Sequence, residues 1–300
     1  DESNYWSKVG LLDGDPENRG SVPLADENIA RLDEYMRAFN QPLSTVDLEQ
    51  GKYANTGFTQ WGASGLAVAW AEENTRDSIF KAFKRKETFA TTGTRIAVRF
   101  FGGYDMSSID LNSESLVSES YKKGVTMGAD LLQDESKIPE FIVWAQKDKN
   151  GAPLQRVQII KGWIDTNSGR PKEKVYDVAC SDGNKVDPLT NRCPDNGARV
   201  NITDCSYSKN VGSSELKTIW KDPDFSHTDK AFYYVRVLEN PTCRWSTWDA
   251  INEDPPLRPR EDLHETIQER AWSSPIWYIP NPSDVEVIPL GGTIRMRNID

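Results

Sequence analysis

Histidine is scarce in this sequence: there are two among 300 residues, and neither lies in a metal-binding pattern. Catalytic metal sites need several His, Asp, Glu or Cys side chains that converge on one point. His227 and His264 each stand alone in a polar segment, outside any H-x-H, H-E-x-x-H or D-x-H pattern. We therefore expect both to be surface residues, and we expect no metal ligand, no cofactor and no catalytic residue in this chain.

Several other signatures are missing as well. The sequence has no G-x-S-x-G nucleophile motif, no G-x-x-x-x-G-K-[ST] phosphate loop and no G-x-G-x-x-G motif, so serine-based and nucleotide chemistry lack support. No apolar run approaches the roughly 20 residues that a membrane-spanning helix needs. The formal net charge of −10 would repel a phosphate backbone, and no run of Lys or Arg is long enough to make a cationic stripe. We expect neither a membrane nor a nucleic acid as a partner.

The length and composition are those of a folded globular protein. Ten Trp, ten Tyr and ten Phe supply large apolar surfaces for a core. The length of 300 residues allows one large domain or two moderate ones, and we expect two. Because the sequence begins at Asp1 with neither an initiator Met nor a signal-peptide pattern, we expect a chain that has been processed, truncated or retained only in part.

All four cysteines lie in the second half of the chain, at Cys180, Cys193, Cys205 and Cys243. None forms a C-x-x-C pair, and three pairings are possible. Gly, Pro and Asp crowd the segment between Cys180 and Cys193, so we favour a disulfide that closes this loop, with Cys205 and Cys243 as the second pair. Two disulfides predict an oxidising compartment, either the periplasm or the outside of the cell. The alternative, four buried free thiols, fits their polar neighbours less well.

Hydrophobic spacing predicts a helix and a strand early in the chain. Apolar residues recur at three- and four-residue spacings over residues 26–39, which indicates a helix with one apolar face. The short apolar run at residues 66–70 predicts a buried strand, because Gly and acidic residues bound it.

A second helix is predicted directly after this strand, over residues 75–85. Asn74 caps its start, and lysines gather at its end, where positive charge complements the helix dipole. Ile79, Phe80 and Phe83 form its predicted buried stripe. A strand followed by a helix is typical of α/β architecture.

Beyond residue 93 the pattern changes to that of antiparallel strands. Apolar and polar residues alternate in TRIAVRFF, EFIVWAQ, RVQIIKGW, AFYYVRVLE, SPIWYI and TIRMR, which are separated by segments rich in Gly, Asn, Asp and Pro. Strands of this kind bury one face each, so we predict a mainly antiparallel β-sandwich. Two connections, at residues 104–139 and 246–266, exceed the length of a turn.

The segment TTGTR carries the first candidates for substrate binding. Thr92, Gly93 and Arg95 stand at a predicted turn, where a hydroxyl, exposed N–H groups and a guanidinium suit an anion. A tight turn whose Arg95 pairs with a nearby carboxylate explains the segment equally well. Glu72 follows the predicted strand and is a further candidate, because carboxylates at strand ends often line active sites in α/β folds.

Tryptophan suggests a different kind of site. Trp248 is a candidate for stacking on a sugar, since an exposed Trp presents a large rigid surface. Trp is also an ordinary core residue, which is the default interpretation for Trp277. An exposed Trp such as the candidate Trp248 motivates the alternative function of a secreted β-sandwich module that binds carbohydrate or another ligand. A glycosidase with a carboxylate pair is a weaker alternative.

The stretch WAEENTRDSIFKAFKRKETFATTGTRIAVRFFGG resembles the end of a PHP-type domain, named after polymerase and histidinol phosphatase. Its strand, helix and TTGTRI turn match the last elements of such domains. Five more blocks agree: DESNYWSKVGLLDG, LQRVQIIKGW, EKVYDVAC, AFYYVRVLENPTCRW and TIQERAWSSPIWY. Together they resemble a bacterial domain-of-unknown-function family, number 3604, in which a PHP-like half precedes a β-rich half.

This resemblance implies a metal-dependent hydrolase of phosphoester-like substrates, with a distorted α/β barrel whose H-x-H and D-x-H motifs bind a divalent metal. Residues 1–98 would form the carboxy-terminal portion of the barrel and residues 99–300 the β-sandwich, an α+β fold. In relatives, the stretch like DESNYW follows the final D-x-H motif. We therefore expect the metal in an amino-terminal PHP-like segment that precedes Asp1. That segment is the expected partner, and the isolated chain is predicted to be inactive towards its small-molecule substrate.

Overall fold

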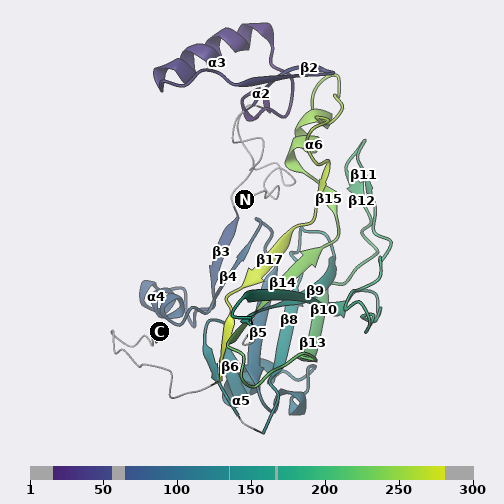
Figure 1. The fold of residues 1–300 in the computed structure, drawn as a ribbon. Coiled ribbons are helices and arrows are strands. Elements are labelled where there is room, and N and C mark those ends of the chain that lie inside the picture. The colour runs from purple at the N-terminus through teal and green to yellow at the C-terminus, as the bar shows by residue number, and fades with distance from the viewer. Residues whose placement is uncertain (1–15, 56–64, 135, 166–167, 281–300) are drawn as a thin grey trace.

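The computed structural model describes residues 16–55, 65–134, 136–165 and 168–280. This part of the chain is mostly β-sheet, with a few short helices (Figure 1). The helices are α2 (Pro16–Arg19), α3 (Asp26–Ala38), α4 (Arg76–Lys84), η2 (Met106–Ser108), α5 (Leu116–Lys123) and α6 (Trp245–Ile251). The sequence block at residues 1–14 and the predicted strand at residues 293–297 lie outside the described residues.

Two sheets form the body of the molecule. The larger sheet contains β3 (Leu66–Ala69), β4 (Thr88–Thr91), β7 (Asp130–Leu132), β9 (Leu154–Ile164), β10 (Pro171–Cys180), β14 (Ala231–Glu239), β17 (Arg270–Ser273) and β18 (Ile276–Ile279). The smaller sheet contains β5 (Ala97–Gly103), β6 (Gly124–Thr126), β8 (Glu140–Gln146) and β13 (Glu215–Lys221). Three two-stranded ribbons join β1 (Thr45–Leu48) to β2 (Gly51–Ala54), β11 (Val200–Asn201) to β12 (Ser206–Tyr207), and β15 (Thr242–Cys243) to β16 (Thr266–Ile267).

Neighbouring strands are mostly antiparallel in the two sheets. The larger sheet runs β10-β9-β14-β17-β4-β3, with β18 also beside β14 and β7 beside β18. The smaller sheet runs β13-β8-β5-β6. The pair β18–β7 is parallel, whereas the other described pairs are antiparallel. The antiparallel strands expected beyond residue 93 are therefore confirmed.

The two sheets pack face to face around one core. Phe100 of β5 and Phe141 of β8 meet Ile159 of β9 and Val235 of β14, and all four side chains are fully buried. Buried residues alternate with more exposed ones along most of β14, which is the pattern of a strand with one buried face. The core is thus made by inward residues of strands from both sheets.

The long connection at residues 104–139 covers the outer face of the smaller sheet. Met106 of η2 and Leu116 of α5 form a second buried cluster with Phe101 and Ile142 of that sheet. The same connection supplies β6 and β7. It is therefore a packed layer of the fold, and the other long connection, at residues 246–266, contains α6.

The strand and the second helix predicted early in the chain form as β3 and α4, within one residue of their expected ends. Thr75, not Asn74, caps α4, because its hydroxyl accepts a hydrogen bond from Ser78 N at 3.3 Å. The predicted burial is wrong for both elements. β3 is half-exposed at the sheet edge, and Phe80 and Phe83 of α4 are 57% and 53% exposed. Periodicity identifies an apolar face, but it does not say what covers that face.

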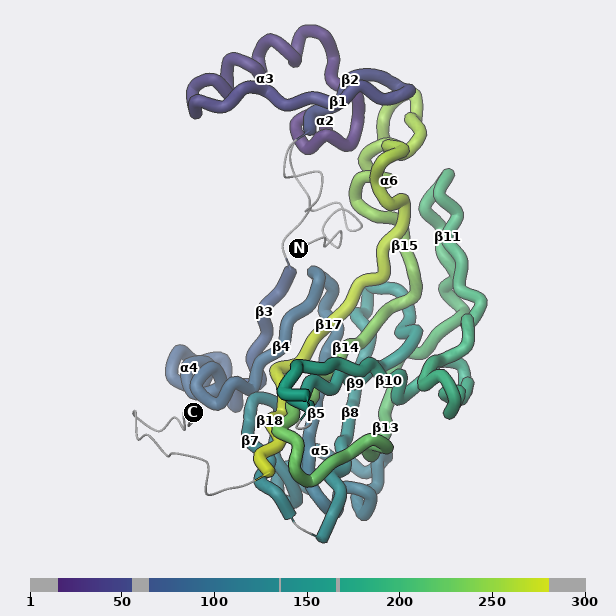
Figure 2. Tube along the Cα trace, in the orientation of Figure 1, coloured from purple at the N-terminus to yellow at the C-terminus, as the bar shows by residue number. Residues whose placement is uncertain are grey.

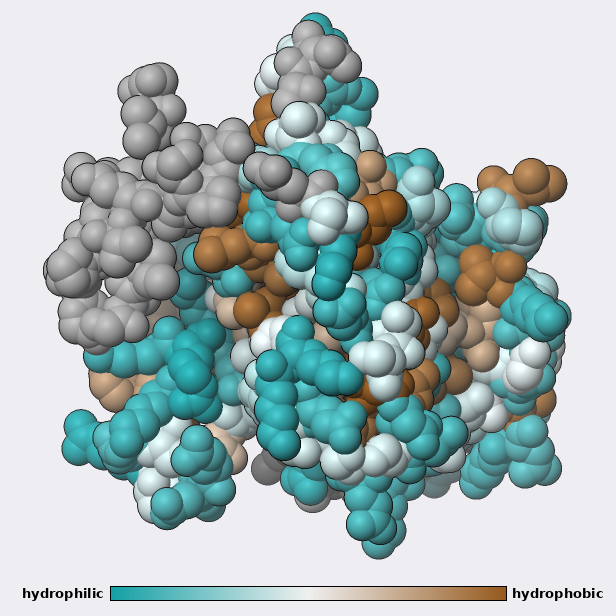
Figure 3. Space-filling view, turned by 90° about the horizontal axis from the view of Figure 1, so that it is seen from below, coloured by the Kyte–Doolittle hydropathy of each residue, from teal (hydrophilic) through white to brown (hydrophobic). Residues whose placement is uncertain are grey.

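Apolar side chains are exposed at other places too. No residue of α3 is buried, and Tyr35 and Phe39 are each 61% exposed. Trp277 of β18, expected in the core, is 39% exposed because it lies on the outer face, against the ring of Phe232. Figure 3, a view from below, shows a mainly hydrophilic surface with separate apolar patches. No helix in the described ranges is both long and apolar enough to cross a membrane.

A small lobe of α2, α3 and the β1–β2 ribbon lies apart from the sandwich, next to α6 (Figure 2). Arg19 of α2 donates two hydrogen bonds to Asp249 of α6, at 2.9 and 3.2 Å. The buried Arg260 donates from Nη1 to the carbonyl oxygens of Gly20 and Ala54, at 2.7 and 3.1 Å. Polar contacts therefore fix the early part of the chain to its last third.

The two parts expected from the sequence, residues 1–98 and 99–300, share one sheet. β3 and β4 of the first part extend the larger sheet through β17 of the second, and β5 runs across the boundary. No barrel closes among the described residues. The fold is α+β with antiparallel sheets.

One buried ion pair lies at the edge of the core. Lys161 Nζ is 2.6 Å from Asp222 Oδ2, and the two side chains are 2% and 0% exposed. Nζ also donates to the carbonyl oxygen of Asp224 at 2.8 Å, and the Tyr233 hydroxyl donates to Asp222 at 2.8 Å. Burial, and then the charge of Asp222, raise the pKa of Tyr233, which keeps it a neutral donor. Each buried charge therefore depends on its partner.

Replacing this lysine tests that dependence. Lys161→Met should lower the free energy of unfolding by about 3–5 kcal/mol, because Asp222 would stay buried without its counter-charge. Lys174→Met, which removes a more exposed pair with Asp224, is the matched control and should cost about 1 kcal/mol or less. Urea unfolding followed by Trp fluorescence measures both. The double variant Lys161→Met with Asp222→Leu should regain most of the loss. Equal unfolding midpoints for the two single variants would contradict this role.

Candidate functional site

The TTGTR segment forms a tight turn between β4 and β5. Thr91 Oγ1 accepts a hydrogen bond from Gly93 N at 3.1 Å, and Gly93 has a φ of 119°, a conformation that favours glycine. Thr92 is buried. Its hydroxyl donates to the Glu269 carboxylate and accepts from Arg270 N at 3.0 Å. Thr92 therefore ties the turn to the start of β17.

Arg95 is the exposed member of the turn. Its backbone N–H donates to Asp148 Oδ2 at 2.6 Å, and Asp148 also accepts from Asn150 N at 2.8 Å. A carboxylate beside Arg95 is thus present, as one interpretation of the sequence expected, but it binds the backbone N–H. The guanidinium of Arg95 extends from a turn whose backbone is fixed.

The remaining two sequence candidates lie elsewhere. Glu72 is exposed in the connection from β3 to α4. Because Leu66 is opposite Thr91 in the β3–β4 pair, Glu72 and Thr92 lie at opposite ends of this hairpin. Trp248 is half-buried in α6, and its indole N–H has no hydrogen-bond partner among the described residues. Of the four candidates, only the two in the TTGTR segment lie together.

The two histidines are also far from forming a metal centre. His227 lies between β13 and β14 with its ring 4.9 Å from that of Phe225, whereas His264 is exposed before β16. Within the described ranges, no three His, Cys, Asp or Glu side chains form a group that could hold a metal ion. The residues described here therefore do not fit a catalytic metal centre.

A different set of polar residues gathers on the outer face of the larger sheet. In register order across β17, β14, β9 and β10, one row reads Trp272, Arg236, Gln158 and Asp177, and the next reads Arg270, Leu238, Arg156 and Cys180. Residues opposite each other in register share a face of the sheet. Arg156, Arg236 and Arg270 therefore lie on one face, which we call the arginine face.

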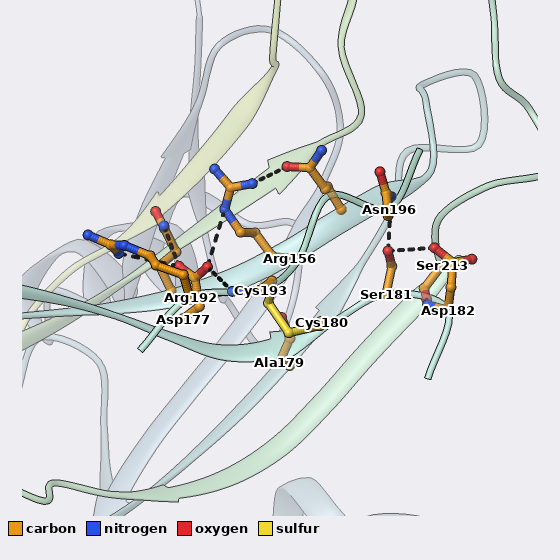
Figure 4. The surroundings of a disulfide bond; sticks show 12 residues. Arg156, Asp177, Ala179, Cys180, Ser181, Asp182, Arg192, Cys193, Asn196 and Ser213 are labelled. Atoms are coloured by element: carbon orange, nitrogen blue, oxygen red, sulfur yellow. Dashed lines mark hydrogen bonds and ion pairs between the residues drawn. A yellow bond between two sulfur atoms is a disulfide. The ribbon is translucent and has the colours of Figure 1, made fainter. Parts of the chain in front are cut away.

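Asp177 is the buried acid of the arginine face. Its Oδ1 accepts from Gln158 Nε2 at 2.6 Å, and its Oδ2 accepts from Cys193 N at 2.7 Å. Arg156 Nε lies 3.7 Å and Arg192 Nη1 lies 3.6 Å from the same carboxylate (Figure 4). One carboxylate thus faces two guanidinium groups, while both of its oxygens accept shorter hydrogen bonds from other donors.

The Cys180–Cys193 disulfide brings Arg192 to this face. It joins the end of β10 to a loop residue 13 positions later, and Arg192 precedes the second cysteine (Figure 4). The other disulfide, Cys205–Cys243, spans 38 positions and joins the β11–β12 ribbon to β15. Both predicted pairings are confirmed, and disulfides of this kind are typical of oxidising compartments.

Removing the first disulfide should destabilise the fold measurably. In the chain-entropy model, the double variant Cys180→Ala with Cys193→Ala should have a free energy of unfolding lower by about 3 kcal/mol, because the unfolded chain gains the conformational freedom of an open loop. Cys205→Ala with Cys243→Ala opens a longer loop and should lose about 4 kcal/mol. Thermal unfolding gives both values, and peptide mapping without reductant verifies the remaining pair. Unchanged stability of both double variants would show that the bridges do not constrain the chain.

A hollow of about 410 Å³ adjoins the arginine face, where β9 and β17 begin. Gln155, Gln268 and Arg270 line it on the sheet side, and Arg199 and His264 line it from two loops. Gln155 Oε1 accepts hydrogen bonds from Gln268 Nε2 at 3.0 Å and from Arg156 Nη1. Through Gln155, the hollow is therefore connected to the arginine face.

Sequence reasoning missed this arrangement. Alternation in RVQIIKGW, AFYYVRVLE and TIQERAWSS places each arginine on the outer side of its own strand. It does not say that these three strands are neighbours, because strand order in a sheet is not written in the alternation. The alternation thus predicts the face on which each arginine lies, but it does not predict that the three arginines lie close together.

The structure is that of a β-rich protein with two packed, mainly antiparallel sheets and a polar site on the outer face of one of them. The family described as "Protein of unknown function (DUF3604)" matches residues 1–280, so the chain belongs to this family. The resemblance to that family is therefore confirmed. Neither the curated proteins nor the solved structures contain a match to this chain.

Proposed function

We propose that this chain is the carboxy-terminal part of a periplasmic or secreted metal-dependent hydrolase of PHP-like type that acts on phosphoester-like substrates. In this proposal an amino-terminal segment of the same polypeptide carries the divalent metal. The described chain completes that α/β domain with β3 and α4 and adds the β-sandwich. The two disulfides support the compartment. The observation that carries the proposal is the edge formed by β3 and α4, which no other strand in the described part of the chain covers.

This edge has both features of a docking site for another β and α unit. β3 pairs with β4 on one side, and no described strand pairs with its other side. The free N–H and C=O groups of an edge strand are a template for a further strand. Beside it, α4 exposes Phe80 and Phe83, and neighbouring exposed apolar side chains mark interaction surfaces. A preceding strand and helix of the same polypeptide would cover both.

The metal is assigned to the preceding segment because the described residues do not supply its ligands. A bound divalent metal would provide an activated water for phosphoester cleavage. The role of this chain is to contact the substrate. Arg95 is the proposed contact to the substrate anion, since its side chain is exposed while Asp148 fixes its backbone. Thr92 holds the other side of the turn through Glu269.

The isolated chain should bind no stoichiometric transition metal and should not hydrolyse an aryl phosphate ester, because a hydrolytic centre needs several preorganised ligands. Metal content by mass spectrometry and turnover of p-nitrophenyl phosphate with added Mn²⁺ or Zn²⁺ measure this. Adding the preceding segment should produce metal-dependent hydrolysis of this ester.

In that reconstituted enzyme, Arg95→Ala should weaken substrate binding with the fold intact. Arg37→Ala, on the far lobe, is the matched control and should leave substrate binding unchanged. Robust metal-dependent turnover by the isolated chain would show that the active site lies in this chain, against the proposal.

A further inference from the structure

We propose that the hollow beside Arg270 is a binding site for a tetrahedral oxyanion, the sulfate or phosphate group of a larger ligand, held by Arg199 and Arg270, which line it, and by Arg156, which borders it through Gln155. The site is formed by this chain alone. It therefore does not depend on the metal-dependent activity proposed above, and the two can be tested separately.

The strand register places two of these arginines around one point. Arg156 of β9 and Arg270 of β17 are both opposite Leu238 of β14, one on each side. Neighbouring strands are about 4.8 Å apart, so the Cα atoms of the two arginines are roughly 10 Å apart. Arg270 donates from Nε to the carbonyl oxygen of Gln268 at 3.1 Å, and Arg156 donates from Nη1 to Gln155. Both guanidinium groups are therefore held beside residues that line the hollow.

Two irregularities in the strands shape the site. The register of β9 against β14 shifts between Leu154 and Arg156, so Gln155 is the extra residue of a bulge. The register of β10 against β9 shifts in the same way between Asp177 and Ala179. Bulges redirect side chains and are frequent next to functional sites. At the first bulge, the side chains of the consecutive residues Gln155 and Arg156 are hydrogen bonded to each other.

Positive charge exceeds negative charge at this place. The two rows of the arginine face and the lining of the hollow contain four arginines and two aspartates, Asp177 and Asp195, and Arg192 shares Asp177. The chain as a whole carries a formal net charge of −10, so this surplus is local. Arg199 forms two hydrogen bonds with Asp195 at the rim, at 2.7 and 3.2 Å. The surplus lies on the Arg156 side of the hollow.

Arg156 is only partly paired within this group. Its Nε is buried and has no hydrogen-bond partner among the described residues, although Asp177 lies 3.7 Å away. Burial lowers the pKa of Arg156, Asp177 acts against this, and the charges of Arg192 and Arg236 lower it further. An anion beside the Nη groups of Arg156 would relieve this repulsion.

The chemistry of the donors selects the ligand. Guanidinium groups offer pairs of parallel N–H donors that match two oxygens of a sulfate or phosphate, and hydrogen bonds between ionised groups are roughly twice as strong as neutral ones. Gln268 adds a polar wall, and the volume of about 410 Å³ leaves room for atoms attached to the oxyanion. The formal net charge of −10 disfavours such a ligand over the molecule as a whole.

Calorimetric titration of the purified chain tests the site. Sodium sulfate and inorganic phosphate should bind at one site, with affinity that falls as ionic strength rises, while sodium chloride at matched ionic strength should not compete specifically. Arg270→Gln and Arg156→Gln should each weaken binding by about ten-fold or more, the loss expected for one charged hydrogen bond. Arg37→Gln, an exposed arginine of α3, is the matched control and should bind like the wild type.

Further arms separate the ligand sources and the possible failures. Dextran sulfate binding far more tightly than inorganic sulfate, with no binding of uncharged dextran, would indicate a sulfated glycan. Tight inorganic phosphate binding with no gain from dextran sulfate would indicate a phosphorylated small molecule. If Arg156→Gln unfolds, Arg199→Gln at the rim replaces it, and circular dichroism verifies folding. No binding of either anion, or equal weakening by Arg37→Gln, would overturn the proposal.

Discussion

The alternation of side chains along β14 is the constraint that connects the core of this protein with its arginine face. β14 pairs with β9, β17 and β18, so its register sets the faces of three other strands. Its inward residues, such as Val235 and Val237, are fully buried, and its outward Arg236 reaches the outer face. A shift by one residue would bury Arg236 and expose Val235. Burying an unpaired charge is prohibitive, so the hydrophobic core and the position of the arginines are fixed together.

Charge balance distinguishes the inside of the sandwich from its outer face. Inside, Lys161 has Asp222 as a close partner and a carbonyl oxygen as a second acceptor, which leaves a closed and neutral group. On the outer face, Asp177 is shared between Arg156 and Arg192 at longer distances. The first arrangement stabilises a fold and leaves nothing for a ligand to satisfy. The second leaves a local surplus of positive charge beside a hollow, which an anion can neutralise.

Local structure could be predicted from the sequence, whereas contacts between distant segments could not. The strand at residues 66–70 and the helix at residues 75–85 formed as expected, because apolar spacing reports local structure directly. The Cys180–Cys193 pairing was predictable because a short polar loop separates the two cysteines. The exposure of Phe80 was not, since periodicity gives an apolar face without its partner. Thr92, a candidate for substrate binding, is buried, and its hydroxyl donates a hydrogen bond to Glu269, a residue 177 positions later in the chain.

The edge formed by β3 and α4 decides whether this chain is part of a larger hydrolase. Hydrogen–deuterium exchange of the chain, alone and mixed with the folded, metal-loaded preceding segment, measures directly whether that segment covers this edge. We expect the amides of β3 and α4 to exchange more slowly in the mixture, while those of β10, at the opposite edge of the same sheet, keep their rates. Unchanged exchange in β3 and α4 would contradict the proposed docking and, with it, the assignment of this chain as the completing part of a metal-dependent hydrolase.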